Sequence, residues 1–194
     1  MFRSKTVFVL GAGASQEVGL PTGDDLKKKI ASKIDIRFDS FQQKHGDYRI
    51  TEALREHVKN IDGWGQDINP YLSMAWQLCE ALPLEISIDN LLDKHRGDKI
   101  AETCGKLGIV SSILEAEKAS RLHYKPTDER KLNFSALSNT WFAGFVKILT
   151  EKVAKTEVGS LFDNVTFLSF NYDRCIEHFL HEALQVSYSL DAAT

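Results

Sequence analysis

An apolar strand pattern that runs straight into a glycine-rich loop opens the chain and constrains its fold most strongly. Residues 7–10 read VFVL, and residues 11–23 continue as GAGASQEVGLPTG. A continuous apolar run with β-branched residues is typical of a parallel strand that is covered on both faces. Small residues after such a strand let backbone N–H groups approach a bound anion, and a following helix adds its partial positive charge. The pattern favours a nucleotide-binding loop over a tight glycine turn that merely ends the strand.

A second polar loop follows an apolar strand pattern near the other end of the chain. Residues 165–170 read VTFLSF, and the triplet Asn171-Tyr172-Asp173 precedes a predicted helix with one apolar face. Because ligands of open α/β sheets bind outside the carboxyl ends of the strands, we expect Asn171 to face the same crevice as residues 11–15. A neutral amide suits a ribose hydroxyl or a water molecule. Asp173 has two open interpretations, a ligand contact or a cap of the following helix.

The sequence between these two segments predicts mostly helices. Thr22 is the expected N-cap of a first helix, and alternation over residues 34–38 indicates a short second strand. Residues 48–158 have helical patterns, with the strongest apolar stripe over residues 137–149. We therefore predict one domain over residues 1–194, with a parallel sheet interrupted by a helical insertion at about 48–158.

Local signals within this helical stretch mark individual helices. Pro70 suits the first position of one helix, and Ser87 is expected to cap a short one. Gly105 and Gly108 weaken the helix predicted from about residue 100, because glycine is a poor helix former.

Taken together, the two loops resemble those of the sirtuin-like NAD-binding domains. In that family a Gly-Ala-Gly-x-Ser loop followed by Gly-Ile/Leu-Pro pairs with an Asn-x-Asp motif at the end of a later strand. The matching stretches here are residues 11–15, 19–21 and 171–173, in the family's order. The resemblance implies an α/β fold with a Rossmann-like parallel sheet, NAD as the ligand, and Asn171 as the catalytic residue that positions ribose and water. It also implies NAD contacts from Gly11, Ala12, Gly13, Ala14, Ser15, Pro21, Thr22, Asn171 and Asp173.

Two departures narrow the resemblance. Protein-deacylating sirtuins carry Asp-Phe-Arg where this chain has Thr22-Gly23-Asp24. They also carry a four-cysteine zinc module, which the scattered Cys79, Cys104 and Cys175 cannot form. The chain is therefore more similar to the NAD-cleaving domains of bacterial antiphage defence proteins, which usually join this domain to a sensor module and deplete NAD. That similarity implies NAD as a substrate, no bound metal, and a sensor domain or partner protein.

The family also carries a catalytic His, followed by Gly, on a strand well after the Asn-x-Asp helix. No such pair follows Asn171, so either the domain continues in a longer chain or this member lacks the residue. We expect the first, with a sheet that is incomplete here. The expected activity is hydrolysis of the nicotinamide–ribose bond of NAD. A non-catalytic nucleotide sensor and an NAD-dependent protein deacylase stay open as alternatives, as does NADP in place of NAD. A dehydrogenase is disfavoured because Gln16 stands where its fingerprint requires a third glycine.

Composition sets the remaining limits. The formal net charge of −3 does not indicate a nucleic-acid partner. No run of about 18 apolar residues is present and no hydrophobic leader precedes the first strand, so we expect a cytoplasmic protein without membrane contact. Three unpaired cysteines fit reduced thiols in that compartment. The oligomeric state stays open, with a homo-oligomer as one alternative. His178 and His181 have a spacing that can hold a metal, but we expect them on a solvated helix face.

Overall fold

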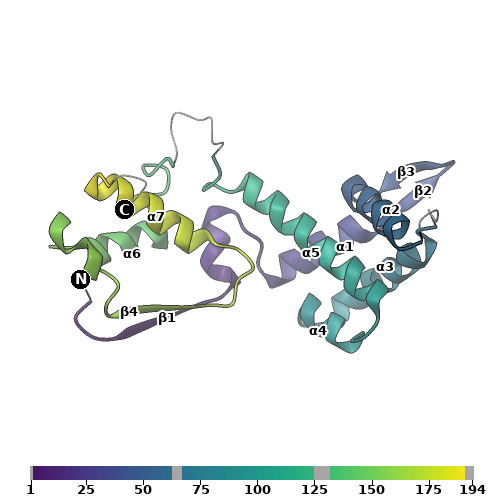
Figure 1. Cartoon of the computed structure of the whole chain (residues 1–194), viewed down its shortest axis with the longest axis horizontal. Helices are drawn as coiled ribbons and strands as arrows, with labels where there is room; N and C mark the ends of the chain where they lie inside the picture. Colours follow the sequence, from purple (N-terminus) through teal and green to yellow (C-terminus); the bar gives the residue numbers. More distant parts are fainter. Residues whose placement is uncertain (1, 63–66, 125–131, 191–194) are drawn as a thin grey trace. The chain divides into compact units, whose positions relative to one another are not determined.

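The computed structural model of the chain describes residues 2–62, 67–124 and 132–190. It is a mixed α/β structure in which helices predominate and one small sheet holds two parallel strands (Figure 1). The chain divides into two compact units. Unit 1 is formed by Met1–Pro21 with Ala116–Thr194, and unit 2 by Thr22–Glu115.

Each unit has its own set of elements and its own hydrophobic core. Unit 1 contains β1 (Thr6–Leu10), the 3-10 helix η1 (Ala12–Val18), α6 (Trp141–Thr150), η3 (Lys155–Ser160), β4 (Val165–Ser169) and α7 (Cys175–Tyr188). Unit 2 contains α1 (Gly23–Ile34), β2 (Arg37–Asp39), β3 (Gln42–His45), α2 (Tyr48–Asp62), α3 (Asn69–Ala81), η2 (Leu82–Leu84), α4 (Ile88–Lys94) and most of α5 (Lys99–Ala119). The helical unit thus has bounds different from the predicted 48–158, because α1 packs against α3 whereas α6 packs against α7.

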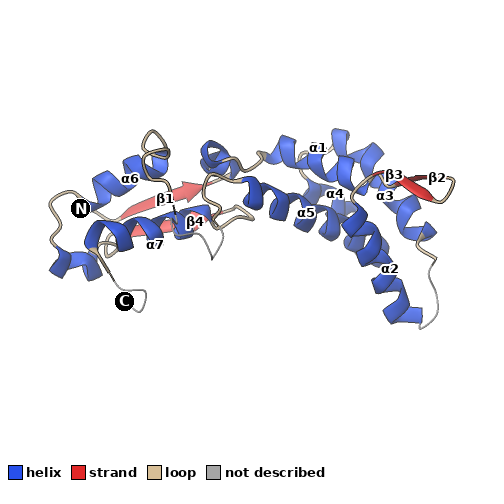
Figure 2. Cartoon of the chain, turned by 90° about the horizontal axis from the view of Figure 1, so that it is seen from above, coloured by secondary structure: helices blue, strands red, loops and turns tan. Residues whose placement is uncertain are grey.

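The two strands of unit 1 are parallel and directly paired, which agrees with the expectation of neighbouring or near-neighbouring strands in a parallel sheet. Leu10 lies opposite Ser169, so both strands end at the same edge of the sheet. Helices α6 and α7 lie on one side of the strands (Figures 1 and 2). The ring of Phe145 on α6 contacts Phe8 of β1 and Phe167 of β4, at centroid distances of 5.0 and 5.4 Å. This aromatic cluster joins α6 to the covered face of the sheet.

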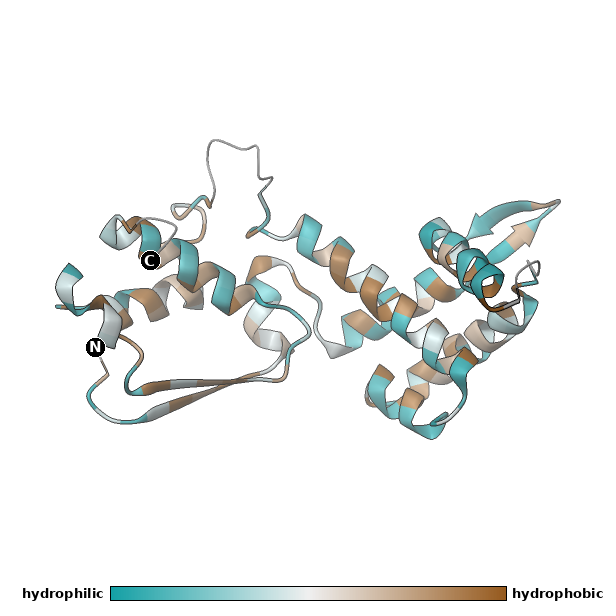
Figure 3. Cartoon of the chain, in the orientation of Figure 1, coloured by the Kyte–Doolittle hydropathy of each residue, from teal (hydrophilic) through white to brown (hydrophobic). Residues whose placement is uncertain are grey.

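The other face of the β1–β4 pair is open in the described part of the chain. Val7, Val9 and Leu168 are 57%, 66% and 50% exposed, although residues 7–10 of β1 form a continuous apolar run (Figure 3). The sequence predicts a strand covered on both faces, and the structure differs because α6 and α7 pack on the same side. Apolar character at every strand position is typical of sheets with two covered faces.

Most local signals in unit 2 are confirmed, and the second strand has an unexpected partner. Helix α1 starts directly after Thr22, and the Ser87 hydroxyl accepts a hydrogen bond from Asn90 N at the start of α4. The short strand predicted over residues 34–38 begins later, as β2, because Ile34 is the last residue of α1. Strand β2 pairs antiparallel with β3 in a separate hairpin. Ile36, just before β2, is fully buried, and its carbonyl accepts a hydrogen bond from Trp76 Nε1.

The two glycines of α5 mark close contacts between helices. A Cβ atom at Gly105 would lie 2.5 Å from the side chain of Leu92 on α4. At Gly108 it would lie 2.8 and 2.9 Å from the side chains of Ile30 and Ile34 on α1. The low helix propensity of glycine is therefore offset in α5 by the close approach of its neighbours.

We expect Gly108→Ala to destabilise unit 2 by about 1–3 kcal/mol, because overpacking outweighs the gain in helix propensity. Gly144→Ala on α6 is the matched control, since a Cβ there would meet no atom within 4 Å. The control should raise stability by about 0.5–1 kcal/mol. Urea denaturation of both variants checks the pair. A stabilising Gly108→Ala would show that α5 does not approach α1 closely.

A carboxylate network ties three helices of unit 2 together. Asp47 accepts hydrogen bonds from Lys33 Nζ on α1 at 3.1 Å, from Ser111 Oγ on α5 at 2.5 Å, and from the Arg49 side chain on α2 at 3.0 Å. Burial opposes the charge of Asp47, but the hydrogen bonds from Arg49, Ser111 and Lys33 outweigh it and hold its pKa well below the ordinary value of 3.8. Asp47 is therefore a charged anchor in the folded state.

Replacing Asp47 by Asn should lower stability at neutral pH by about 2 kcal/mol, since Lys33 and Arg49 lose a charged acceptor. The folded-state pKa is depressed, so the contribution of Asp47 is complete above the unfolded value and is lost as the pH falls through the folded-state pKa. The wild-type and variant stability curves should therefore converge in acid. Denaturation across the acid range, with exposed Asp39→Asn as control, measures this. A difference that does not change with pH would contradict it.

Candidate functional site

The glycine-rich segment after β1 forms a short 3-10 helix, which sequence patterns did not indicate. Helix η1 ends at Gly19, whose φ of +98° is the left-handed conformation that favours glycine. Gly19 N donates a hydrogen bond to Gln16 O at 3.0 Å. Gly19 is therefore required by the backbone of this segment.

Side chains from distant parts of unit 1 hold η1 in place. Trp141 donates from Nε1 to Ala14 O at 2.6 Å and from its backbone N to Glu17 Oε2 at 2.7 Å. The Ser120 hydroxyl donates to Val18 O at 2.7 Å. Local sequence patterns do not identify Trp141, Glu17 or Ser120 as partners of this segment. The only available signal was the indole N–H of Trp141, which needs an acceptor when the ring is packed.

The glycines at positions 11 and 13 have no structural requirement of this kind. Both residues are exposed, neither has a positive φ, and a Cβ at either position would meet no atom within 4 Å. The fold would accept a side chain at both positions. The absence of side chains at these positions leaves room for a ligand at the start of η1. The first N–H groups of a helix have no acceptor earlier in the helix, although Ala14 N here donates to Gly11 O at 2.8 Å.

The two predicted loops meet at the carboxyl edge of the sheet. The Ser15 hydroxyl donates to Asp173 Oδ1 at 2.8 Å, and Asn171 Nδ2 donates to Ser15 Oγ at 3.4 Å. Ser15 is only 2% exposed. Asp173 Oδ1 also accepts from Cys175 N at 3.0 Å, at the start of α7. Asp173 thus binds the first N–H of α7 and holds the first loop, whereas the N-cap position itself is Arg174. We call these residues the Ser15–Asn171–Asp173 cluster.

One atom of this cluster has an unfilled hydrogen-bonding capacity. Asn171 Oδ1 is buried and has no hydrogen-bond partner among the described residues. Burying a carbonyl oxygen without a hydrogen-bond partner lowers the stability of a protein by about 1–3 kcal/mol, so such atoms are rare in folded proteins. A donor from outside the protein, such as a hydroxyl group or water, would satisfy it.

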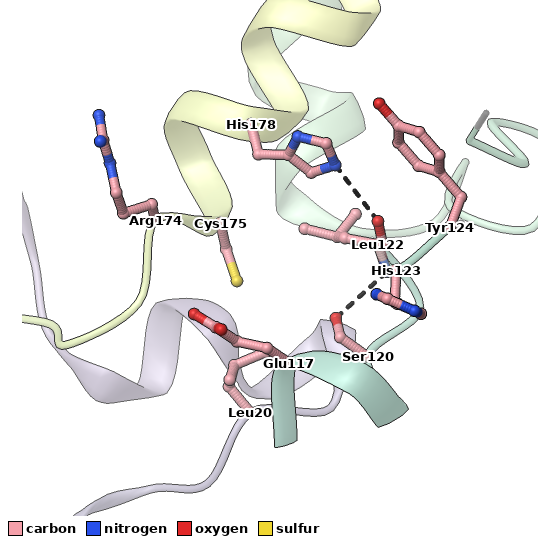
Figure 4. Close-up of a pocket in the computed structure, with 9 residues that line it drawn as sticks. All are labelled: Leu20, Glu117, Ser120, Leu122, His123, Tyr124, Arg174, Cys175 and His178. Carbon is pink, nitrogen blue, oxygen red and sulfur yellow. Dashed lines mark hydrogen bonds between the residues drawn. The ribbon is translucent and has the colours of Figure 1, made fainter. Parts of the chain in front are cut away.

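A cavity of about 390 Å³ lies in unit 1 beside the cluster (Figure 4). Arg174 and Cys175, which follow Asp173 directly, line it together with Glu117 and His178. Burial, and then the neighbouring Asp173 carboxylate, raises the pKa of the Cys175 thiol. A thiol held protonated in this way is a poor nucleophile.

The expectation of a solvated histidine face is wrong for His178. Its ring stacks on Tyr124 at a centroid distance of 5.6 Å, and its Nε2 lies 3.3 Å from Leu122 O (Figure 4). His181 is exposed and contacts Gln185. His178 lies one helical turn from the buried Cys175 and Glu182, so the contact face of α7 extends beyond its stripe of apolar residues. Among the described residues, no group of three or more His, Cys, Asp or Glu side chains is arranged to hold a metal.

Two of the predicted NAD contacts, Pro21 and Thr22, fall at the boundary between the two units. Pro21 is the last residue of the first segment of unit 1, and Thr22 belongs to unit 2. The Thr22 hydroxyl donates to Asp25 Oδ2 at 2.7 Å in the first turn of α1. No hydrogen bond among the described residues links either one to the cluster. Ala12 and Ala14 lie within η1, where Ala14 contributes its carbonyl to Trp141.

The three cysteines are free thiols, as the sequence predicts. Burial raises the pKa of Cys79 and Cys104 to about 12. No helix in the described part of the chain combines the length and apolar character needed to cross a bilayer.

Comparisons with protein-family models, with curated proteins and with solved structures found no match for this chain. The structure defines a mixed α/β protein with a polar cluster at the carboxyl edge of two parallel strands.

Proposed function

We propose that unit 1 binds NAD and hydrolyses the bond between nicotinamide and ribose. The observation that carries this proposal is the buried Asn171 Oδ1, which lacks a partner beside Ser15 at the edge where β1 and β4 end. This is where open α/β sheets bind their ligands, and a ribose hydroxyl or water is a donor that fits.

The binding part of the proposal uses the start of η1. Gly11 and Gly13 are exposed and are not required by the fold, so close approach of a ligand accounts for their small size. The pyrophosphate of NAD would accept hydrogen bonds from the accessible backbone N–H groups there. The hydrogen bond from Ser15 to Asp173 joins this segment to the loop that carries Asn171, so it fixes the two loops of the site relative to each other.

The chemical part of the proposal assigns a positioning role to Asn171. Cleavage passes through an oxocarbenium-like transition state, in which the C1′–N bond breaks and its electrons leave with neutral nicotinamide. The oxygen of water then bonds to C1′ and releases a proton. Asn171 holds the water and the ribose, and its own amide is oriented by the bond from Nδ2 to Ser15. The resemblance also implies a catalytic His that acts as a base. The His-Gly pair that carries it in the family does not occur after Asn171 in this sequence.

We further propose that β1 and β4 belong to a Rossmann-like parallel sheet, and that the protein is a cytoplasmic effector of bacterial antiphage defence. The parallel pairing and the apolar sequence of both strands support the first part. The second part, including a sensor domain or partner protein, rests on the resemblance of the two loops to that group of proteins.

Incubation of the protein with NAD, followed by chromatography of the products, tests the proposal. We expect nicotinamide and ADP-ribose in equal amounts without any added peptide, and a parallel incubation with NADP gives the cofactor preference. Saturable NAD binding without nicotinamide release would instead identify a nucleotide-binding protein without turnover. Release that requires an acylated peptide would identify a deacylase.

A further inference from the structure

Unit 2 holds a second cavity, which has no part in the proposed chemistry. It measures about 590 Å³ and is formed by α1, the turn between β3 and α2, and the end of α5 within unit 2. Its charged lining comprises the cations Lys28, Lys29, Lys33 and Arg49 and the carboxylates Asp47 and Glu115. Cations are therefore in excess in this cavity, although the whole chain has a net charge of −3.

The two carboxylates already have partners, so the excess charge is available. Asp47 lies 3.1 Å from Lys33 and 3.0 Å from Arg49, and Glu115 lies 2.7 Å from Lys33. Lys28 and Lys29 form no ion pair within the described residues. Asp25, one turn earlier on α1, feels their charge but takes its hydrogen bond from Thr22. Two lysines thus face this cavity without a bonded counterion.

Neutral donors lie beside the two lysines. The hydroxyl groups of Ser32 and Tyr48 line the cavity and have no hydrogen-bond partner among the described residues. His45 also lines it, with Nδ1 bonded to the carbonyl of Asp35 at 2.8 Å. Hydroxyl and ammonium groups together offer many donors, which suits an anion with several acceptor oxygens.

The wall of the cavity is held in a fixed geometry. Gly46 has a φ of +82°, and a Cβ there would lie 2.7 Å from the buried side chain of Ile36. The turn is also bonded to α1, because Asp47 N donates to Lys33 O at 2.8 Å. A site that is already ordered loses less entropy when it binds a ligand.

We propose that this cavity binds the phosphate group of a small anion through Lys28 and Lys29, with Ser32 and Tyr48 as hydroxyl donors. Phosphate offers several acceptor oxygens and a negative charge that the two lysines neutralise. The site is separate from the NAD contacts of unit 1 and does not depend on them.

Calorimetric titration of the protein with pyrophosphate, ADP and adenosine at constant ionic strength tests this site. We expect pyrophosphate and ADP to bind and adenosine not to bind. The double variant Lys28→Gln with Lys29→Gln should weaken this binding about tenfold or more, because charged hydrogen bonds to phosphate are lost. The control is Lys44→Gln with Lys59→Gln, which removes the same charge from unit 2 outside the cavity.

The variant Gly13→Val separates this site from the proposed NAD site, where phosphates would also bind. Binding that persists in Gly13→Val and weakens in the lysine variant supports the cavity whether or not the protein cleaves NAD. Tighter binding of ADP than of pyrophosphate identifies a nucleotide as the source of the phosphate, and the reverse identifies an inorganic anion. Equal binding by wild type and the lysine variant, or binding of a DNA duplex but of neither small anion, overturns the proposal.

Discussion

Gly13→Val is expected to abolish NAD binding while leaving unit 1 folded. A Cβ atom at this exposed position would meet no heavy atom within 4 Å, so we expect the folded state to tolerate a valine. The same side chain would block the approach of the pyrophosphate to the backbone of η1. If two hydrogen bonds from backbone N–H groups to the charged pyrophosphate are lost, NAD binding should weaken at least about a hundredfold. Calorimetric titration with NAD measures the affinity, and thermal denaturation measures the fold.

Gly159→Val is the matched control for this experiment. Gly159 is an exposed glycine of η3 in the same unit, and a Cβ there also meets no atom within 4 Å. It should retain the affinity of the wild-type protein. If Gly13→Val binds NAD as tightly as this control, the segment after β1 is not the pyrophosphate site.

Asn171→Ala should lower turnover about a hundredfold, or by about 3 kcal/mol, while NAD affinity changes little. Only interactions that are stronger in the transition state than in the ground state accelerate a reaction. An amide that holds water and ribose during bond cleavage is such an interaction. An amide that only shapes the loop through Ser15 would instead lower affinity and turnover together. Nicotinamide release, measured beside calorimetric affinity, separates these two cases.

The exposed Asn139 of unit 1 provides the control for this measurement. Asn139→Ala removes the same amide outside the cluster and should leave both turnover and affinity unchanged. Full turnover by Asn171→Ala would mean that Asn171 is not the catalytic residue and that the resemblance of its loop is misleading.

Features that depend on a few neighbouring residues could be predicted from the sequence. The apolar run 7–10 forms β1, and the run 165–170 forms β4 with its last residue outside the strand. Ser87 caps α4 through Asn90, three positions later. Such interactions are satisfied within one turn or one strand, so the local pattern is sufficient. The pairing of β1 with β4 was predictable as well, because both strands end in loops of matching character.

Which faces of the sheet are covered by helices depends instead on contacts between distant parts of the chain. The apolar residues at positions 7, 9 and 168 predict two covered faces, yet α6 and α7 pack on one side of β1 and β4. Position along the chain does not show which face of a strand a distant helix will cover. Helix propensity alone predicts that the glycines of α5 weaken the helix. The close approach of Gly108 to Ile30 joins segments far apart in sequence, so the local pattern does not show it.

For the candidate site too, the sequence shows the residue types and the tertiary structure decides their contacts. The residue types at positions 11–15 and 171–173 were sufficient to select them as ligand contacts, because small residues and a neutral amide have a limited range of uses after a strand. The bond from Ser15 to Asp173 spans 158 positions, and the burial of Asn171 Oδ1 depends on everything packed around it. The cavity of unit 2 likewise needs α1, α2 and α5 to converge. Local sequence therefore determined which groups are available, and tertiary packing decided which of them meet and which are left without a partner.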